Sequence, residues 1–267
     1  MALIRQAGHV PHYKSSKDEK WHTVLEEPTD LVAVAGGDGT VAKVARRLIR
    51  SDIPLAILPL GTANNVFKTL YPPSSIEDLI AGWTSGQRRS CDLGSARGPW
   101  GKTCFIESFG IGLLARIISA HAGRAFSVEE GAEICRTYPV RPLKVILDGQ
   151  DLSGAYVLLE AMNTKFIGAN FHLAPEALPD DRFLDLVLLG SEEREQFIAY
   201  LASRTGNLPA PPLFPVRKGE HLHVEFQGCD LHVDDEVWRD KDFSSFPSPS
   251  VVDVNVDGSA LEFLIPL

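Results

Sequence analysis

Apolar residues follow two different rhythms along this chain of 267 residues. Over about the first 90 residues, short apolar runs at 31–35 and 53–58 alternate with helical patterns. This alternation is typical of strand–helix–strand units built around a parallel sheet. Between the two runs, the pattern over 41–49 predicts a helix whose apolar face is formed by Val41, Val44, Ala45 and Leu48.

Further helices are predicted at three places. A helix over 74–86 is indicated by the capping-box spacing of Ser74 and Glu77 and by Gly86 as its stop. The first eight residues are expected to be the end of a helix, with no apolar strand before it. One more helix is predicted over 192–205.

From about residue 143 onward, strand patterns dominate. Alternation such as Leu222-His223-Val224-Glu225-Phe226 is typical of antiparallel strands packed in two layers. The predicted strands cover 143–147, 155–161, 184–189, 221–226, 251–256 and 261–265. The proline-rich segment 208–215 is expected to be a rigid connection.

Glycine-rich loops follow the first two apolar runs. The first loop contains Gly36, Gly37, Gly39 and Thr40 around the acid Asp38, and the second reads Gly61-Thr62-Ala63-Asn64-Asn65. Glycines allow backbone N–H groups to approach an anion closely, and a helix starting near Thr40 would direct its positive end toward that anion. Two such loops at one edge of a parallel sheet favour a phosphate-bearing ligand. Asp38 beside phosphates indicates chemistry assisted by a metal or a base.

Glycine-rich loops after a strand occur in several kinds of protein. A tight strand-to-helix turn would need glycine for its shape alone. A P-loop is excluded because no Gly-Lys-Ser/Thr sequence is present. The dinucleotide fingerprint fits Gly37, Gly39 and Ala42, but the next strand ends at Leu58 without the acid that would hold a ribose.

Composition narrows the class of protein. The formal net charge of −9 argues against a nucleic-acid-binding surface, and no apolar run approaches the ~20 residues of a membrane span. The four cysteines lack paired spacing, which favours free thiols in a reducing, cytoplasmic compartment. The histidines, including His232, show no metal-binding spacing and are expected to be structural or surface residues.

The loops and several later segments resemble the diacylglycerol kinase catalytic domain family, which also includes sphingosine, ceramide and bacterial lipid kinases. Its two nucleotide loops are similar to the segments at 36–40 and 59–65. The segments that extend the resemblance to the end of the chain lie at 89–94, 109–112, 175–185 and 232–236.

The chain also departs from the family pattern. Asn65 stands where many relatives have Asp, Arg182 replaces the Gly of a DG pair, and Asp235 replaces the Gly of the DGE box. The family's opening strand, with its Asn- and Gly-containing loop, is not found before residue 1. These departures lead us to expect weaker metal binding and reduced activity.

The resemblance implies a fold of two domains. An α/β domain with a parallel sheet, like that of NAD kinase and diacylglycerol kinase, is expected over residues 1–93. An antiparallel β-sandwich domain that accepts the lipid is expected over 94–248, after which 249–267 returns to the first domain.

The resemblance also implies residue roles. It assigns catalysis to Asp38, Asp234 and Glu236, with Glu236 as the general base, although Asp-Asp also commonly forms a polar hairpin turn. It assigns a Mg²⁺ network to Asp92, Asp181 and Asp185, of which the second also suits a plain turn. The nucleotide ATP would contact Gly36, Gly37, Gly39, Thr40, Gly61, Thr62 and Asn64.

The expected activity is that of an ATP- and Mg²⁺-dependent lipid kinase that phosphorylates a hydroxyl of diacylglycerol or a similar lipid at the membrane surface. The protein would be cytoplasmic or peripheral to the membrane, and an exposed sheet edge would permit a homodimer. Two alternatives remain: a kinase of a soluble substrate, related to NAD kinase, and a non-catalytic nucleotide-binding regulator.

Overall fold

The two apolar runs of the N-terminal region form a parallel pair of strands, β1 (Val32–Gly36) and β2 (Leu55–Pro59). Gly36 pairs with Pro59, so both strands end at the same edge of the sheet and their glycine-rich loops emerge side by side. This arrangement is seen in a computed structural model that describes residues 1–122, 124–204, 214–239, 242 and 246–266.

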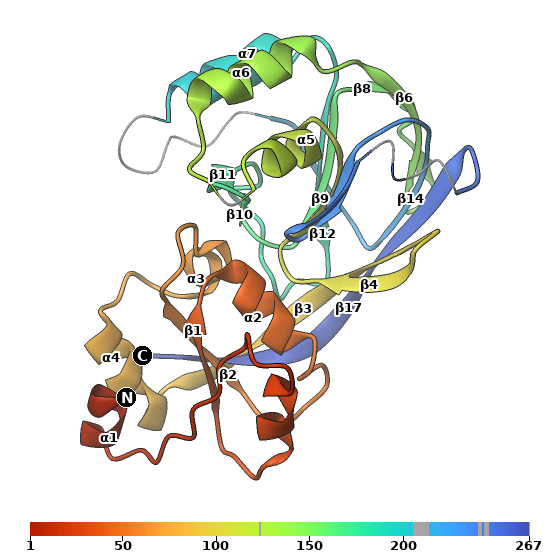
Figure 1. Ribbon diagram of the computed structural model, residues 1–267. Coiled ribbons are helices and arrows are strands. Elements are labelled where there is room, and N and C mark those ends of the chain that lie inside the picture. The colour runs from red at the N-terminus through yellow and green to blue at the C-terminus, as the bar shows by residue number, and fades with distance from the viewer. Residues whose placement is uncertain (123, 205–213, 240–241, 243–245, 267) are drawn as a thin grey trace.

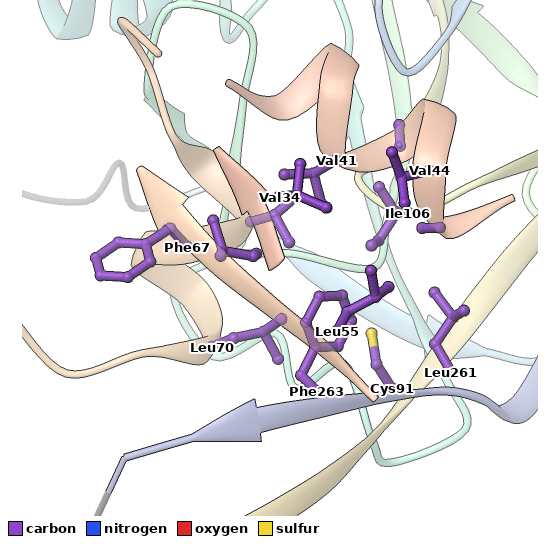
Figure 2. Packing of buried hydrophobic residues seen from close by; sticks show 14 of the residues in the cluster. Val34, Val41, Val44, Leu55, Phe67, Leu70, Cys91, Ile106, Leu261 and Phe263 are labelled. Carbon is purple, nitrogen blue, oxygen red and sulfur yellow. The ribbon is translucent and has the colours of Figure 1, made fainter. Parts of the chain in front are cut away.

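Helix α2 (Asp38–Ala45) follows β1 directly and packs its apolar face on the sheet. It begins at Asp38, earlier than the expected start near Thr40, with Gly37 as its N-cap. The four residues predicted for its inner face are all buried, which confirms that part of the prediction. Figure 2 shows this core, which α2 shares with β2 and with the end of the chain through Val44, Leu55 and Phe263.

The remaining helices of the first domain are short. Ser75 caps the helix that follows it, since its hydroxyl accepts the N–H of Asp78 at 3.0 Å. The capping box predicted at Ser74 and Glu77 is therefore wrong by one residue. These elements are α1 (Ala2–Gln6), the 3₁₀ helix η1 (Trp21–Glu26), α3 (Asn65–Leu70), α4 (Ile76–Ala81) and the 3₁₀ helix η2 (Gly82–Thr84).

The second domain is the expected antiparallel sandwich. One layer is a six-stranded sheet whose neighbours all run antiparallel, in the order β13 (Val216–Gly219), β12 (Leu184–Leu189), β9 (Leu158–Met162), β5 (Ser108–Gly112), β15 (Leu231–Val233) and β16 (Glu236–Trp238). The facing layer contains β4 (Gly101–Phe105), β6 (Arg141–Leu147), β7 (Gln150–Asp151), β8 (Gly154–Tyr156) and β14 (His221–Phe226).

An apolar core fills the space between the two layers, with Phe109 and Leu159 from one sheet against Val145 and Val224 from the other. Helices cover the outer face of the six-stranded sheet (Figure 1). They are α5 (Leu113–Ala120), α6 (Val128–Thr137) and α7 (Arg194–Ala202), and the small ribbon of β10 (Phe166–Ile167) and β11 (Phe171–His172) lies near them.

Two long antiparallel strands, β3 (Gln87–Gly98) and β17 (Ser250–Ile265), run from one domain into the other (Figure 1). The first part of β17 pairs with β14, and Phe263 pairs with Leu55 of β2. The two strands predicted at 251–256 and 261–265 are thus one strand, with a register shift between Asp257 and Leu261. The return to the first domain occurs in its second half rather than at residue 249.

The strand predicted over 155–161 is divided at Val157, where the chain leaves β8 in one layer and enters β9 in the other. The helix predicted over 192–205 is α7, and the predicted connection at 208–215 lies mostly outside the described residues. All four cysteines are free, and three are buried. Among the described helices, none has the length and apolarity required to cross a membrane.

Candidate active site

The two glycine-rich loops touch each other through their glycines. A Cβ placed on Gly61 would lie 2.3 Å from the Cα of Gly37, a distance that no side chain tolerates. The N–H of Leu60 also donates to the carbonyl of Gly36 at 3.1 Å. Glycine is therefore required at Gly37 and Gly61 because the two backbones come too close for any larger residue.

The second loop is closed by Asn64, which lies in the left-handed region at φ 54°. Its side-chain oxygen accepts the N–H of Gly61 at 3.0 Å, and its amide donates to the carbonyl of Gly61 at 2.9 Å. Thr62 is left exposed at the tip of the loop, while Thr40 packs against Gly36 of the first loop. All of the predicted nucleotide-contacting residues lie on these two adjoining loops.

Asp38 is the first residue of α2 and lies where the two loops meet. Its Oδ1 accepts the N–H of Val66, at the start of α3, at 3.0 Å. Burial raises the pKa of Asp38 above its ordinary value, although the amides of Val66 and Asn65 oppose that shift. The carboxyl group thereby fixes the second loop against the first helix.

The acidic pair predicted at the end of a strand is a hairpin turn. Strand β15 ends at Val233, and Asp234 and Asp235 form the two-residue connection to β16. Asp234 is buried and adopts φ 51°, whereas Glu236 is exposed. The expectation that Asp234 and Glu236 share one strand face is wrong, because the strand does not continue past Val233.

Asp234 is fully engaged by other groups. Its carboxylate accepts the N–H groups of Ile106 at 3.1 Å and Glu107 at 2.8 Å. It also forms an ion pair at 2.8 Å with Arg46, which follows α2. Burial raises the pKa of Asp234, and Arg46 acts in the opposite direction. These contacts give Asp234 the role of holding the hairpin in place.

Asp235 brings this hairpin to the first glycine loop. A Cβ placed on Gly39 would lie 2.5 Å from the Oδ2 of Asp235. The acidic turn of the second domain thus reaches the loop of the first domain that carries Asp38. Glu236 is the next residue, at the start of β16.

Glu107 is a site residue that sequence reasoning did not find. It lies between β4 and β5, is only 3% exposed, and accepts an N–H from the side chain of Asn65 at 2.8 Å. Burial, with the carboxylates of Asp38 and Asp234 close by, raises the pKa of Glu107 well above its ordinary value. No local pattern marks Glu107, since its partner lies 42 residues earlier in the chain.

A buried polar row supports the hairpin from below. His232, Gly110 and Glu160 occupy paired positions on β15, β5 and β9, and the imidazole meets the carboxylate across the bare glycine at 2.9 Å. The other ring nitrogen contacts the carbonyl of Asp234 at 2.9 Å. The expectation that His232 is a structural histidine is confirmed.

The three predicted metal ligands are not brought together with Asp38. Asp92 is buried and accepts the N–H groups of Arg182 at 2.6 Å and Ser259 at 2.7 Å. Asp181 pairs with Lys218 at 2.5 Å, and the same ammonium lies 3.8 Å from Asp185. Within the described part of the chain, no three His, Cys, Asp or Glu side chains are grouped to hold a metal ion.

Arg182 explains one of the departures from the expected pattern. It adopts φ 67°, a conformation that glycine enters without strain and that costs other residues roughly 1 kcal/mol. The backbone therefore keeps the shape that a glycine would give, and the N–H of Arg182 is anchored on Asp92.

Comparisons with known proteins agree with this geometry. A family model described as "Diacylglycerol kinase catalytic domain" matches residues 4–96, and one described as "YegS C-terminal NAD kinase beta sandwich-like domain" matches residues 123–260. A protein named diacylglycerol kinase from Mycobacterium tuberculosis (strain ATCC 25618 / H37Rv) is 25% identical over 266 residues, which covers 89% of this chain and 77% of that protein.

Two further relatives give the same result. A protein named diacylglycerol kinase from Bacillus subtilis (strain 168) is 26% identical, covering 73% of this chain and 68% of its own. The crystal structure of a diacylglycerol kinase from Bacillus anthracis str. Sterne shares the fold, with a TM-score of 0.69 at 23% identity over 98% of this chain and 88% of that one. This chain therefore belongs to the diacylglycerol kinase catalytic domain family, with a YegS-type β-sandwich as its second domain.

Proposed function

We propose that this protein is a lipid kinase that transfers the γ-phosphoryl group of ATP to a hydroxyl of diacylglycerol or a similar lipid. One observation carries the proposal: the acidic hairpin of the second domain lies against the glycine loop of the first, with Asp235 beside Gly39. Phosphoryl transfer depends mainly on positioning and on charge stabilisation, so a donor loop and an acidic group from opposite domains are suited to it.

The nucleotide would bind at the joined glycine loops. The first N–H groups of α2 lack partners within the helix, and the end of the helix carries partial positive charge, so the phosphates would lie there. The residues proposed to contact ATP are Gly36, Gly37, Gly39, Thr40, Gly61, Thr62 and Asn64. Asp38 would orient the γ-phosphoryl group.

The lipid hydroxyl would lose its proton to Glu236. Its oxygen would attack the γ-phosphorus, the bond from that phosphorus to the β–γ bridging oxygen would break, and ADP would leave. Asp234 is a weaker candidate for the base because Arg46 and two backbone amides already bind its carboxylate. Its proposed role is to hold the hairpin that presents Glu236.

Mg²⁺ would enter as the counter-ion of ATP and thus as part of the substrate. A shared protein site formed by Asp92, Asp181 and Asp185 does not fit the contacts of these residues. Asp92 is occupied by backbone amides, and Lys218 supplies the positive charge beside the other two. No step of the proposed reaction depends on that site.

The test is transfer of label from γ-labelled ATP with Mg²⁺ to a panel of detergent-dispersed lipids, with NAD included as a soluble acceptor. The substitutions Asp38→Asn and Glu236→Gln should each reduce transfer by about 10²-fold or more, the range for a positioned acid–base group. The matched controls are Asp30→Asn and Glu77→Gln, two exposed acids away from the loops, which should leave the rate unchanged.

The remaining outcomes separate the alternatives. Label in NAD and in none of the lipids would identify a soluble-substrate kinase. Binding of ATP without transfer to any acceptor would identify a nucleotide-binding regulator, and transfer that survives both substitutions would refute the residue roles given above.

A further inference from the structure

The side chain of Asn65 connects the nucleotide loops to the second domain. Its amide nitrogen donates to the Oε2 of Glu107 at 2.8 Å and to the carbonyl of Gly168 at 2.9 Å. Because a carbonyl only accepts hydrogen bonds, the nitrogen rather than the oxygen of Asn65 must face Gly168. The orientation of the amide is thereby fixed, and Glu107 receives its second N–H.

Asn65 in turn sets the position of Asp38. It is the first residue of α3, and the backbone amides of Asn65 and Val66 are directed to the Asp38 carboxyl group. A shift of Asn65 would move both amides together. Glu107 therefore acts on Asp38 through one intermediate residue.

The backbone of Glu107 is fixed as firmly as its side chain. Its N–H donates to Asp234 at 2.8 Å, and its carbonyl accepts the N–H of Asn163 at 2.8 Å. Since Asp234 is paired with Arg46, Glu107 lies between the acidic hairpin and the second glycine loop. It is the residue through which these two parts of the site are held together.

Several charges surround the carboxyl group of Glu107. Two acids, Asp38 and Asp234, lie close to it in the buried interior, and the nearby cation Arg46 is already paired with Asp234. A further negative charge at Glu107 would thus add repulsion in a buried setting. The charged and titratable groups on the elements packed around it are Asp38, Arg46, Lys68, Asp234 and Asp235.

We propose, building on the function given above, that Glu107 is a positioning residue of the nucleotide site whose carboxyl group is uncharged in the working protein. As a neutral acid it accepts the hydrogen bond of Asn65, and so holds the loop that fixes Asp38, without adding charge next to the phosphates. When it ionises, repulsion from Asp38 and Asp234 would loosen the loop.

The direction of the pH effect follows from the pKa of Glu107, which burial and the neighbouring carboxylates raise. A carboxyl group with a raised pKa in the folded state stabilises the fold at low pH, and this contribution is lost as the pH rises through that pKa. Glutamine has the same shape and never ionises, so Glu107→Gln should escape the loss.

The first measurement is urea unfolding of the wild type and Glu107→Gln between pH 6 and pH 10, without ligand. The stability of Glu107→Gln relative to the wild type should rise steadily with pH, while the exposed control Glu77→Gln should show a constant difference. A constant difference for Glu107→Gln as well would overturn the proposal that the carboxyl group is uncharged.

The second measurement is the affinity for a fluorescent ATP analogue with Mg²⁺ at pH 7. Glu107→Gln should bind within about threefold of the wild type, whereas Glu107→Ala should bind about tenfold more weakly because a buried N–H of Asn65 loses its acceptor. The variant Asn65→Ala should show a similar loss, and adding Glu107→Ala to it should cause little further change.

The outcomes distinguish this inference from the function on which it rests. Equal affinity in the wild type, Glu107→Ala and Asn65→Ala would overturn the positioning role while leaving the kinase proposal intact. A wild-type protein that binds no nucleotide would overturn both.

Discussion

At the scale of single residues, the acids of this protein divide into those that face the glycine loops and those that hold the backbone. Asp92 belongs to the second group, since both of its oxygens accept backbone N–H groups from distant parts of the chain. Such a carboxylate joins the turn at Arg182 to the irregular part of β17 near Ser259. Its expected role as a metal ligand thus competes with a structural role that the contacts display directly.

Replacement of Asp92 by alanine should therefore lower the free energy of unfolding by about 3 kcal/mol, because two buried amides lose their acceptor. Urea unfolding measures this loss, and Asp30→Ala on the surface serves as the control. A variant of unchanged stability whose activity needs more Mg²⁺ would instead favour the metal-ligand role.

Gly61 provides a second test at this scale. A methyl group there would collide with the backbone of Gly37, and backbone cannot move aside as a flexible side chain can. Gly61→Ala should separate the loops and weaken nucleotide binding by at least about tenfold, within the usual 1–3 kcal/mol cost of overpacking. Gly190→Ala, where the nearest atom is 3.3 Å away on a side chain, should bind nucleotide normally.

At the scale of elements, the position of the acidic hairpin depends on the polar row beneath β15. Burial by itself would lower the pKa of His232, but the Glu160 carboxylate and the carbonyl of Asp234 raise it above its ordinary value. The charged imidazole consequently stabilises the fold below about pH 6.5, and this contribution is lost as the pH rises through the raised pKa.

Glu160→Gln removes the negative partner and should expose this dependence. It should destabilise the protein by about 3 kcal/mol at pH 6, where it leaves a buried imidazolium unpaired, and by less at pH 9. Thermal unfolding monitored across this pH range gives the comparison. A penalty that is the same at both pH values would mean that His232 is neutral throughout.

Sequence patterns predicted some of these elements well. The meeting of the two glycine loops follows from parallel strands whose ends share one edge, and both apolar runs and the inner face of α2 could be read directly. The Asp234–Asp235 turn could be read in two ways, as a strand end or as a hairpin. The structure decides because Asp234 finds the amides of 106–107 and the guanidinium of Arg46.

Other parts of the site could not be predicted, for physical reasons. Glu107 and Arg46 act through partners 42 and 188 residues away, so no periodicity or local spacing marks either one. The division of one apolar run at Val157 and the fusion of two runs into β17 depend on which sheet each residue joins. Such choices are made by tertiary packing, which overrides local preference.

At the scale of the whole molecule, β3 and β17 run from one domain into the other, and the site lies where hairpin and loops from both domains meet. Neither domain can lose these strands without losing part of its own sheet. We therefore expect thermal unfolding to be a single cooperative transition, with far- and near-ultraviolet circular dichroism giving the same midpoint. Two separate transitions would show that the shared strands do not couple the domains.

The joined loops are proposed to deliver the terminal phosphoryl group of ATP to a lipid, and this step can be measured directly. The measurement compares γ-labelled with α-labelled ATP in otherwise identical reactions with Mg²⁺ and dispersed diacylglycerol, followed by extraction of the lipid. We predict label in the lipid from γ-labelled ATP alone, and its loss in Asp38→Asn. A lipid fraction without label from either nucleotide, across the full panel of lipid acceptors, would contradict the proposed transfer.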